Sequence, residues 1–286
     1  MENKKYNTLV LSGGGSKGIP MMGALQYLYD HEIIQEFDSF YGSSVGGILC
    51  VLTILGYTPR QIIIRLIQKN HLSDLPKYDI MNGFQGKGFL NFEKFRIILH
   101  DFIENKVHKI PTMKELYDLY GKSLKMIAFN YTLRKEEILS HETHPDLSVL
   151  DALRMTSNVP FVFENFHKNN HYYFDGFITS NFPICHCDME TDTILGIDCI
   201  RGNWWEDDNE KEIDSFKIFW NLFILPFYNI QNQRNKVNTK DSTVFRLSLK
   251  DLSIFDFEFS NKRLLDVFSV GYTEMKEFYQ TKENLE

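Results

Sequence analysis

The sequence predicts an α/β fold: a central, mostly parallel sheet with helices on both of its faces. Short apolar runs typical of strands alternate along the chain with amphipathic stretches of helical period. This alternation predicts strands that are joined by helical crossovers, which gives a three-layer sandwich. The chain has 286 residues, enough for one large domain, and no stretch rich in Pro, Gly or Ser divides it. We therefore expect a single domain over residues 1–286.

Each of the first two predicted strands runs into a turn that is rich in glycine. The first turn spans residues 13–18, the second spans residues 42–46, and a helix is predicted after each of them. The elements predicted over this part are a strand over 6–12, a helix over 17–33, a strand over 37–41 and helices over 45–56 and 60–69. The chain therefore opens in the order β-α-β-α-α.

The middle of the chain holds one long gap in the periodic pattern. Residues 71–90 contain one proline and three glycines and are predicted to form a loop, of the kind that covers or borders a site. The elements predicted after it are helices over 91–105 and 112–120, strands over 124–130 and 137–140, a helix over 148–157, an irregular stretch after Pro160, and strands over 171–174 and 193–199. The last predicted elements are a helix over 214–231, interrupted near Pro226, a strand over 243–249 and a helix over 262–279.

The charge and the apolar pattern exclude some classes of protein. With 38 acidic and 31 basic residues, the formal net charge of −7 gives no basic surface for nucleic acid. The first residues lack the apolar stretch of a signal peptide, and no run of about 18 uncharged apolar residues is present to span a bilayer. From the sequence we expect a cytoplasmic protein that is not secreted and does not bind nucleic acid.

The cysteines and carboxylates do not indicate a metal site. Four cysteines are too few for a disulfide scaffold in a chain of this length. Cys185, His186 and Cys187 stand together, but no second pair with the spacing of a zinc site occurs elsewhere, so buried reduced thiols are expected. No EF-hand loop or other cluster of carboxylates indicates calcium. We therefore expect no metal and no cofactor.

Two nucleotide-binding motifs are incomplete in this chain. Residues 13–18 have the form G-x-G-x-x-G, which also marks dinucleotide-binding folds. Those folds need an acidic residue near the end of the second strand, whereas here that strand ends in Tyr41 and Gly42. Residues 121–123 (GKS) match the end of a P-loop, yet Leu116 stands where its first glycine belongs. The sequence thus favours another role for the glycine turns.

The two turns together indicate acyl transfer. Residues 42–46 have the G-x-S-x-G pattern of a nucleophile elbow, in which a strained turn exposes the hydroxyl of the middle residue, Ser44. The first turn presents backbone N–H groups, which can bind the negative charge that develops on an attacked carbonyl. In an α/β-hydrolase the elbow follows several strands and precedes an acid and then a histidine. Here it follows only the second strand, which argues against that order.

Four segments of the chain resemble the patatin-like phospholipases. They are LVLSGGGSKGIPMMGAL at 9–25, FYGSSVGGILCVL at 40–52, LDALRMTSNVPFVF at 150–163 and YYFDGFITSNFPI at 172–184. Their order and separations fit the family, and the resemblance spans about residues 6–199, with residues 200–286 completing the domain. It implies a patatin-like fold and a lipid acyl hydrolase of the phospholipase A or lysophospholipase type that works without a cofactor.

The resemblance also implies a catalytic dyad. Ser44 corresponds to the nucleophile and Asp175, 131 positions later (175 minus 44), to the general base. The oxyanion hole corresponds to the first turn, whose residues are Gly13, Gly14, Gly15, Ser16, Lys17 and Gly18. The glycines that complete the two catalytic motifs are Gly42, Gly46 and Gly176. In the family a glycine or alanine usually follows the Asp-Gly pair, whereas this chain has Phe177. The backbone geometry after Asp175 is therefore the feature in which this chain is expected to differ from the family.

Each of these assignments has a structural alternative. In the structural alternative, Ser44 is a packing residue in a tight strand-to-helix crossing. Asp175 is then the start of an ordinary Asp-Gly turn, and Lys17 is a solvated residue at a helix start. Two histidines, His171 and His186, lie close to the aspartate motif in sequence. In the alternative mechanism one of them completes a triad.

A lipid substrate needs an apolar trough for its acyl chain. The residues considered for it are Phe84, Phe89, Leu90, Phe161, Val162 and Phe163, although core packing explains each of them equally well. Residues 216–230 are rich in aromatic side chains and form either a buried helix or a segment that contacts a lipid interface or gates the substrate. The neighbouring acidic residues 206–208 oppose docking on anionic membranes. Peripheral membrane contact is a second expectation, which the aromatic segment favours and the acidic residues weaken.

Two other functions remain open from the sequence. One is a non-catalytic patatin-like protein that binds lipid or a partner through the same pocket. The other is a soluble esterase or thioesterase that acts on small acyl compounds. Release of fatty acid from a phospholipid, compared with cleavage of a short ester, separates these functions from a lipid hydrolase.

Overall fold

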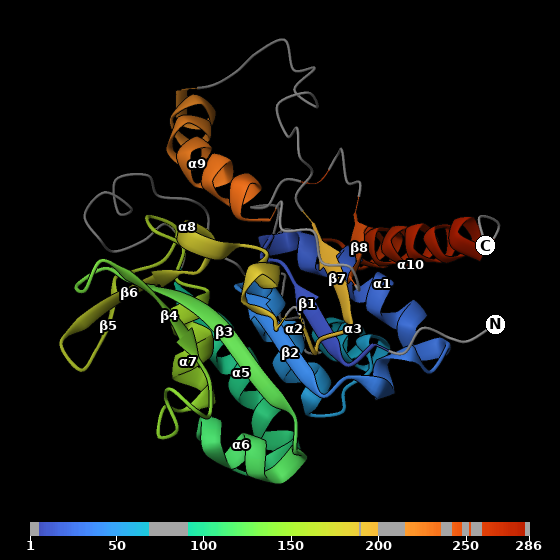
Figure 1. The fold of residues 1–286 in the computed structure, drawn as a ribbon, viewed down its shortest axis with the longest axis horizontal. Coiled ribbons are helices and arrows are strands. Elements are labelled where there is room, and N and C mark those ends of the chain that lie inside the picture. The colour runs from blue at the N-terminus through green and yellow to red at the C-terminus, as the bar shows by residue number, and fades with distance from the viewer. Residues whose placement is uncertain are drawn as a thin grey trace.

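The computed structural model describes residues 6–68, 91–188, 190–199, 215–235, 242–247, 252 and 259–283. These residues contain eight strands that form one sheet (Figure 1). The strands are β1 (Thr8–Leu11), β2 (Ser39–Ser43), β3 (Ser123–Asn130), β4 (Lys135–Leu139), β5 (Phe166–Lys168), β6 (His171–Asp175), β7 (Ile194–Asp198) and β8 (Ser242–Arg246). Helices flank the sheet, so the predicted α/β class is confirmed.

The helices alternate with the strands in the order that the sequence predicts. The α-helices are α1 (Gly18–Asp30), α2 (Val45–Ile54), α3 (Pro59–Gln68), α5 (Phe92–Val107), α6 (Met113–Tyr120), α7 (Val149–Thr156), α8 (Phe177–Ser180), α9 (Ser215–Arg234) and α10 (Asn261–Glu283). The described residues also include short 3-10 helices η1 (Gly15–Lys17), η2 (Ile33–Glu36) and η3 (Pro183–His186). The whole loop predicted over 71–90 and the acidic residues 206–208 lie outside the described residues.

Two elements differ from the sequence prediction. The stretch after Pro160, predicted to be irregular, contains β5, which at three residues is too short to show the alternation of a strand. The predicted interruption near Pro226 is wrong, because α9 continues through it. Pro226 removes only the hydrogen bond to the carbonyl of Leu222, and both residues are exposed, so water can take the place of the missing donor.

One pair of described helices together has the length and composition of a membrane-spanning segment. Within the described ranges, no single helix is long and apolar enough to cross a bilayer. The pair α2 and α3 meets the criteria of length and composition only when the two are taken together, and they are bent by 108° at their break.

The sheet is parallel at its centre and antiparallel on one side. Its strand order is β5-β6-β3-β2-β1-β7-β8, and β4 pairs with β3 outside this path. Within this path, β3, β2, β1, β7 and β8 run parallel to one another. By contrast, β4 and β6 run antiparallel to β3, and β5 runs antiparallel to β6. The carboxyl ends of parallel strands are the usual place of a ligand site in such a sheet.

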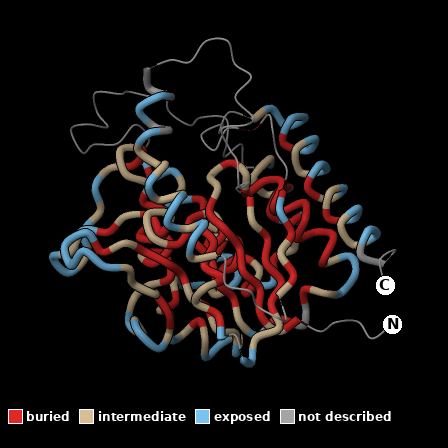
Figure 2. Tube along the Cα trace, turned by 45° about the horizontal axis from the view of Figure 1, so that its top comes forward, coloured by how far each residue is buried: buried red, intermediate tan, exposed pale blue. Residues whose placement is uncertain are grey.

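The core lies mainly between one face of the sheet and the long helices. Alternate residues of a strand point to opposite faces. In β1, Leu9 and Leu11 join this large core, whereas Val10 joins a smaller cluster on the other face with Phe182 and Ile184 at η3. Figure 2 shows the strands as a buried centre, with exposed residues along the outer sides of the helices.

The last described elements, β8 and α10, pack against the first ones. β8 extends the sheet beside β7, and α10 lies along α1 (Figure 1). The two helices approach each other at glycines: a Cβ on Gly23 would lie 1.9 Å from the carbonyl oxygen of Phe268, and one on Gly271 would lie 1.8 Å from that of Pro20. No side chain fits at either position. The backbones of α1 and α10 are therefore in direct contact.

Two strands meet end to end on one edge of β3. Ile127 of β3 pairs with Ser43 at the carboxyl end of β2, and the next residue, Ala128, pairs with Asp175 at the carboxyl end of β6. Residues 126–130 pair with β4 on the opposite edge, so β2 and β6 share the same edge. Because β2 runs parallel and β6 antiparallel to β3, their carboxyl ends face each other. The fold thus joins strand ends that are 132 positions apart (175 minus 43).

Candidate active site

Ser44 occupies a strained turn between β2 and α2. Its backbone has φ 52° and ψ −127°, an unusual conformation that costs a residue with a Cβ about 1–3 kcal/mol and that clusters at functional sites. The flanking glycines are required by close contacts: a Cβ on Gly42 would lie 2.5 Å from the nitrogen of Gly47, and one on Gly46 would lie 2.3 Å from the carbonyl oxygen of Leu11. The G-x-S-x-G segment therefore forms a strand-to-helix elbow.

The glycine turn at residues 13–18 lies directly against Ser44. A Cβ on Gly13 would lie 3.1 Å from the Cβ of Ser44 and 2.3 Å from Oδ1 of Asn181. The N–H of Gly13 donates to the carbonyl of Asn181 at 2.9 Å, and Nδ2 of Asn181 donates to the carbonyl of Gly13 at 3.2 Å. Further along, Ser16 is buried and Lys17 is half-buried. Asn181, which the sequence analysis did not single out, fixes the turn beside the elbow.

The glycine turn contains N–H groups of two kinds. Those of Gly13, Lys17 and Gly18 donate to carbonyls within the protein. For those of Gly14 and Gly15, no acceptor occurs among the described residues. Within the turn, Gly14 and Gly15 thus have N–H groups available to a ligand, whereas those of Gly13, Lys17 and Gly18 stabilise the turn itself.

Asp175 is fully buried at the carboxyl end of β6. Its Oδ1 accepts the N–H of Phe177 at 2.8 Å, and its Oδ2 has no hydrogen-bond partner among the described residues. Burial raises the pKa of Asp175 to about 7, although the Ser44 hydroxyl and the Phe177 N–H oppose this rise. The Ser44 hydroxyl therefore lies near the Asp175 carboxyl group but forms no hydrogen bond of normal geometry with it. Catalytic hydrogen bonds are often long or poorly aligned before a substrate binds. The arrangement suits proton transfer from a hydroxyl near neutral pH.

Gly176 allows β6 to approach β2 at this point. A Cβ on Gly176 would lie 2.4 Å from the carbonyl oxygen of Ile127 and 2.5 Å from Oγ of Ser43. Ser43 is fully buried, and its hydroxyl has no hydrogen-bond partner among the described residues. The glycine of the Asp-Gly pair therefore has a packing role at the junction of the two strands.

Thr156, the last residue of α7, connects the two halves of the site. Its hydroxyl accepts the N–H of Ser44 at 3.1 Å and donates to the carbonyl of Ile127 at 2.5 Å. Its carbonyl accepts the N–H of Gly176 at 3.3 Å. The resemblance over residues 150–163 includes this threonine without giving it a role, because its partners are distant in sequence.

Asn158 holds the strand that carries Asp175. Its carbonyl accepts the N–H of Asp175 at 2.9 Å, and its Nδ2 donates to the carbonyl of Tyr173 at 2.7 Å. The buried Arg154 in turn donates to Oδ1 of Asn158 at 2.6 Å, and its guanidinium lies 4.1 Å from the ring centroid of Phe92. The N–H of Ser44 and the backbone on both sides of Asp175 are thus tied to α7 and the residues after it.

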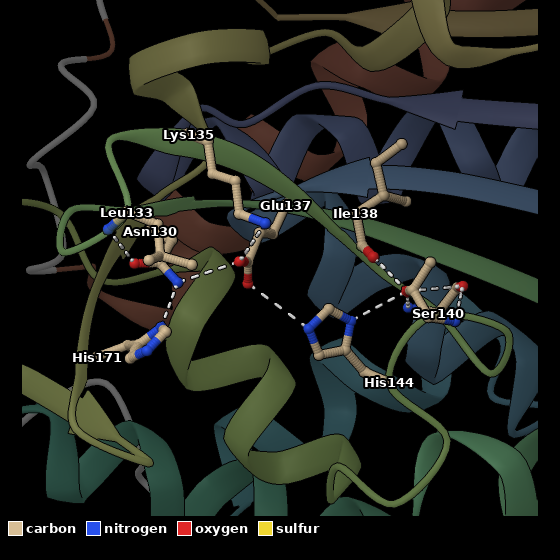
Figure 3. A network of polar contacts seen from close by, with 9 residues as sticks. Asn130, Leu133, Lys135, Glu137, Ile138, Ser140, His144 and His171 are labelled. Carbon is tan, nitrogen blue, oxygen red and sulfur yellow. Dashed lines mark hydrogen bonds and ion pairs between the residues drawn. The ribbon is translucent and has the colours of Figure 1, made fainter.

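The two histidines near the aspartate motif are engaged elsewhere. Nδ1 of His171 lies 2.8 Å from Nδ2 of Asn130, in the polar network that Figure 3 shows. Nε2 of His186 lies 3.1 Å from Oε1 of Glu136. Within the part of the chain that the structure describes, neither histidine forms a hydrogen bond with the elbow serine or the buried aspartate. The geometry favours the dyad over a triad.

Comparison with known proteins assigns the family. A model described as patatin-like phospholipase matches residues 9–186, which is more than half of the chain. The chain belongs to this family. It is 36% identical over 188 residues to a probable lipid hydrolase, 463L, of Invertebrate iridescent virus 6, and the match covers 64% of each protein. It is also 26% identical over 165 residues to the triacylglycerol lipase ptl3 of Schizosaccharomyces pombe, covering 54% of this chain and 33% of the lipase. These matches span less than two thirds of either relative.

The patatin-like fold is also found in a solved structure with little sequence identity. VipD from Legionella pneumophila superposes with a TM-score of 0.53 at 15% identity, over 97% of this chain and 67% of VipD. At this identity the likeness concerns the fold alone. It agrees with the expected fold over nearly the whole chain.

Phe177, where the chain departs from the family pattern, begins α8 and connects it to α9. Its N–H still donates to Asp175, so the departure leaves that contact in place. Its ring packs edge-on against Phe227, with centroids 5.7 Å apart and planes at 89°. Its carbonyl accepts a hydrogen bond from Nε2 of Gln231. The residue thus docks α9 beside the buried aspartate.

Phe161 contacts the same helix from the segment after α7. Its ring centroid lies 6.2 Å from that of Phe219 and 5.5 Å from that of Phe223, and its φ is 67°. Val162 and Phe163 instead belong to the main core. The other residues considered for an acyl trough, Phe84, Phe89 and Leu90, lie outside the described residues. Among the described candidates, Phe161 is therefore the one that faces α9.

Proposed function

We propose that this chain hydrolyses lipid esters with Ser44 as nucleophile and Asp175 as its general base. The observation that carries the proposal is the meeting of β2 and β6 on one edge of β3, which brings a strained serine and a fully buried aspartate together. Membership of the patatin-like family supports the class of reaction. The buried carboxyl group, with its raised pKa, supports the choice of base.

In the first proposed step, Asp175 takes the proton of the Ser44 hydroxyl as its oxygen attacks the ester carbonyl. The N–H groups of Gly14 and Gly15 stabilise the negative charge on the carbonyl oxygen, and one such donor typically contributes about 3 kcal/mol. The leaving alcohol receives the proton from Asp175. A pKa of about 7 suits this exchange, because the carboxyl group must accept and return a proton near neutral pH.

In the second step, water gives a proton to Asp175 and attacks the acyl group on Ser44. The fatty acid leaves, and the Ser44 oxygen takes the proton back from Asp175. Apart from the ester and the water, every group in the two steps belongs to this chain, so the proposal includes no cofactor.

We propose a substrate of the phospholipase A or lysophospholipase type. The support comes from an aromatic stripe on α9, made of Phe219, Phe223 and Phe227 at spacings of four residues. Successive ring centroids in this stripe are 6.3 and 5.4 Å apart. The stripe contacts Phe161 and Phe177, next to the aspartate motif. Such surroundings suit an apolar acyl chain better than a small polar ester.

We also propose that the protein acts in the cytoplasm as a peripheral protein at lipid surfaces. Four apolar side chains in the described part of α9 are exposed: Ile218 at 46%, Phe219 at 39%, Leu222 at 64% and Ile230 at 50%. The same helix contacts Phe177, the second residue after Asp175. If α9 lies against a lipid surface, an ester in that surface would therefore be close to the proposed dyad. Leu222→Glu should then reduce sedimentation with zwitterionic phospholipid vesicles and keep hydrolysis of a short soluble ester. Unchanged sedimentation would contradict this contact.

The experiment that tests the function compares substrates and variants. Wild type and Asp175→Asn are assayed on dispersed phospholipid, on lysophospholipid and on a short p-nitrophenyl ester, with circular dichroism to confirm folding. We expect fatty acid release by the wild type and a loss of roughly 100- to 10,000-fold in the variant, the range of a general base. Cleavage of the short ester alone favours the soluble esterase. No turnover of any ester favours the non-catalytic binding protein.

A further inference from the structure

A second group of reactive side chains lies where four elements meet, separate from the serine and aspartate of the proposed dyad. Its members are Cys185 and His186 of η3, Glu136 of β4, Arg234 of α9, and Thr179 and Ser180 of α8. We call this group the Cys185 cluster. The proposed hydrolysis uses none of these residues.

Ionic contacts hold the cluster together. Nε2 of His186 lies 3.1 Å from Oε1 of Glu136, and the Arg234 guanidinium pairs with both oxygens of the same carboxylate at 3.2 Å. Arg234 also donates to the carbonyl of Thr179 at 2.9 Å. Burial tends to raise the pKa of Glu136, but His186, Arg234 and Thr179 outweigh it and lower the pKa to about 2. The two cationic side chains, His186 and Arg234, thus share the single carboxylate of Glu136. Because the positive charge exceeds the negative charge, a second anionic group beside them is favoured.

Cys185 is the group beside these two cations. Its sulfur lies 3.7 Å from Oγ of Ser180. His186 is the next residue of η3, and Arg234 donates to the carbonyl of Thr179, the residue before Ser180. Burial tends to raise the pKa of the Cys185 thiol, but His186, Ser180 and Arg234 together lower it. Burial tends to lower the pKa of His186, but Cys185 and Glu136 outweigh it and raise the pKa. These shifts favour a thiolate next to an imidazolium, the form in which a cysteine is nucleophilic.

The other three cysteines have the opposite environment. Cys50, Cys187 and Cys199 are buried, and burial raises the pKa of each thiol well above its ordinary value. Cys187 is two positions from Cys185, yet it packs in the small apolar cluster against the sheet. Cys185 is the partly exposed one. Among the described residues, no three His, Cys, Asp or Glu side chains are grouped so that they could hold a metal ion.

We propose that Cys185 is a modification site whose thiolate reacts with hydroperoxides, held in the reactive state by His186 and Arg234. The sulfur attacks one peroxide oxygen, so that an S–O bond forms and the O–O bond breaks. The sulfur is oxidised to a sulfenic acid, and the peroxide is reduced to an alcohol or to water. The departing oxygen takes its proton from the imidazolium of His186.

The wild-type chain tests this proposal, with its three buried cysteines as internal controls. Iodoacetamide is applied at a series of pH values, and peptide mass spectrometry measures the alkylation rate of each cysteine. We expect Cys185 to react at least about 10-fold faster than the others near pH 7, with a midpoint below about 8.5, the pKa of a free thiol. Hydrogen peroxide followed by dimedone should label Cys185 alone. A rate no higher than that of Cys187, or a midpoint at or above that of a free thiol, overturns the proposal.

Variants then test the source of the reactivity. In His186→Gln the midpoint for Cys185 should move upward and the dimedone adduct should decrease, because the imidazolium is gone. His167→Gln is the matched control, since His167 is an exposed histidine of β5. An unchanged midpoint in a folded His186→Gln protein contradicts the role of the imidazolium. If that variant does not fold, the wild-type pH profile still decides the proposal.

Discussion

The hydroxyl of Thr156 accepts the backbone N–H of Ser44 at 3.1 Å. The same hydroxyl donates to the carbonyl of Ile127, whose partner on β2 is Ser43. One side chain of α7 therefore ties the elbow to the sheet at the point where β2 ends. A strained turn persists only when its surroundings hold it, and Thr156 provides this support.

Replacement of Thr156 by valine should disturb the elbow without a change in side-chain volume. The substitution leaves the N–H of Ser44 and the carbonyl of Ile127 buried without their partner, at a cost of about 1–3 kcal/mol for each such group. We expect a lower midpoint of denaturant unfolding and a kcat on a short ester reduced by roughly 10-fold or more, because small displacements of a nucleophile are costly. Thr156→Ser keeps the hydroxyl and should remain close to the wild type. Equal kcat in the valine and serine variants would contradict the supporting role.

The strain at Ser44 predicts a difference between two inactive variants. Ser44→Ala keeps a Cβ in the unusual conformation, whereas Ser44→Gly removes it. Although glycine also increases the entropy of the unfolded chain, release of the strain should outweigh this by about 1 kcal/mol. Urea unfolding of the two proteins measures the difference. A glycine variant that is less stable than the alanine variant would show that the turn is not strained.

The raised pKa of Asp175 predicts how activity depends on pH. As a base it must be ionised, so kcat/KM should fall about 10-fold per unit below pH 7 and level off above about pH 8. His171→Gln should keep the same inflection, because His171 bonds to Asn130 rather than to the dyad. A short ester that is stable over this range provides the assay. A profile that is flat between pH 6 and pH 8 rules out Asp175 as the base with this pKa.

The same pKa predicts that Asp175 destabilises the folded protein at high pH. Its pKa is raised on folding from 3.8 to about 7, so the unfolded chain loses this proton more readily. The contribution of the neutral carboxyl group is fully present below the unfolded pKa and is lost as the pH rises through 7. Asp175→Asn should therefore raise the free energy of unfolding at pH 8, and by much less at pH 5. Denaturant titrations at the two pH values check this, and an equal effect at both would contradict the assignment.

The segments that form the candidate site could be predicted from the sequence because each of them is a short local pattern. The glycine turn, the elbow around Ser44 and the Asp-Gly pair each need particular residue types within a few positions. The alternation of strands and helices likewise follows from local periodicity, and the α/β class is confirmed. The proximity of Ser44 to Asp175 was expected only through the family resemblance.

The contacts that hold these parts together were not readable, because they join distant positions. The N–H of Ser44 donates to Thr156, which is 112 positions away in the sequence, and the carbonyl of Gly13 accepts from Asn181, which is 168 positions away. No local pattern marks either partner. The sequence did not predict that α9 continues through Pro226. The helix tolerates this proline because Pro226 and Leu222, the two residues of the missing hydrogen bond, are exposed to water, and no local pattern in the sequence shows that exposure.

Reaction with a fluorophosphonate probe, followed by intact-protein and peptide mass spectrometry, tests the proposed nucleophile most directly. The buried neighbour Ser43 gives the matched control. We predict one adduct on Ser44 in the wild type and in Ser43→Ala, and none in a folded Ser44→Ala protein. An adduct that persists in Ser44→Ala, or that lies on another residue of the wild type, would contradict the assignment of Ser44.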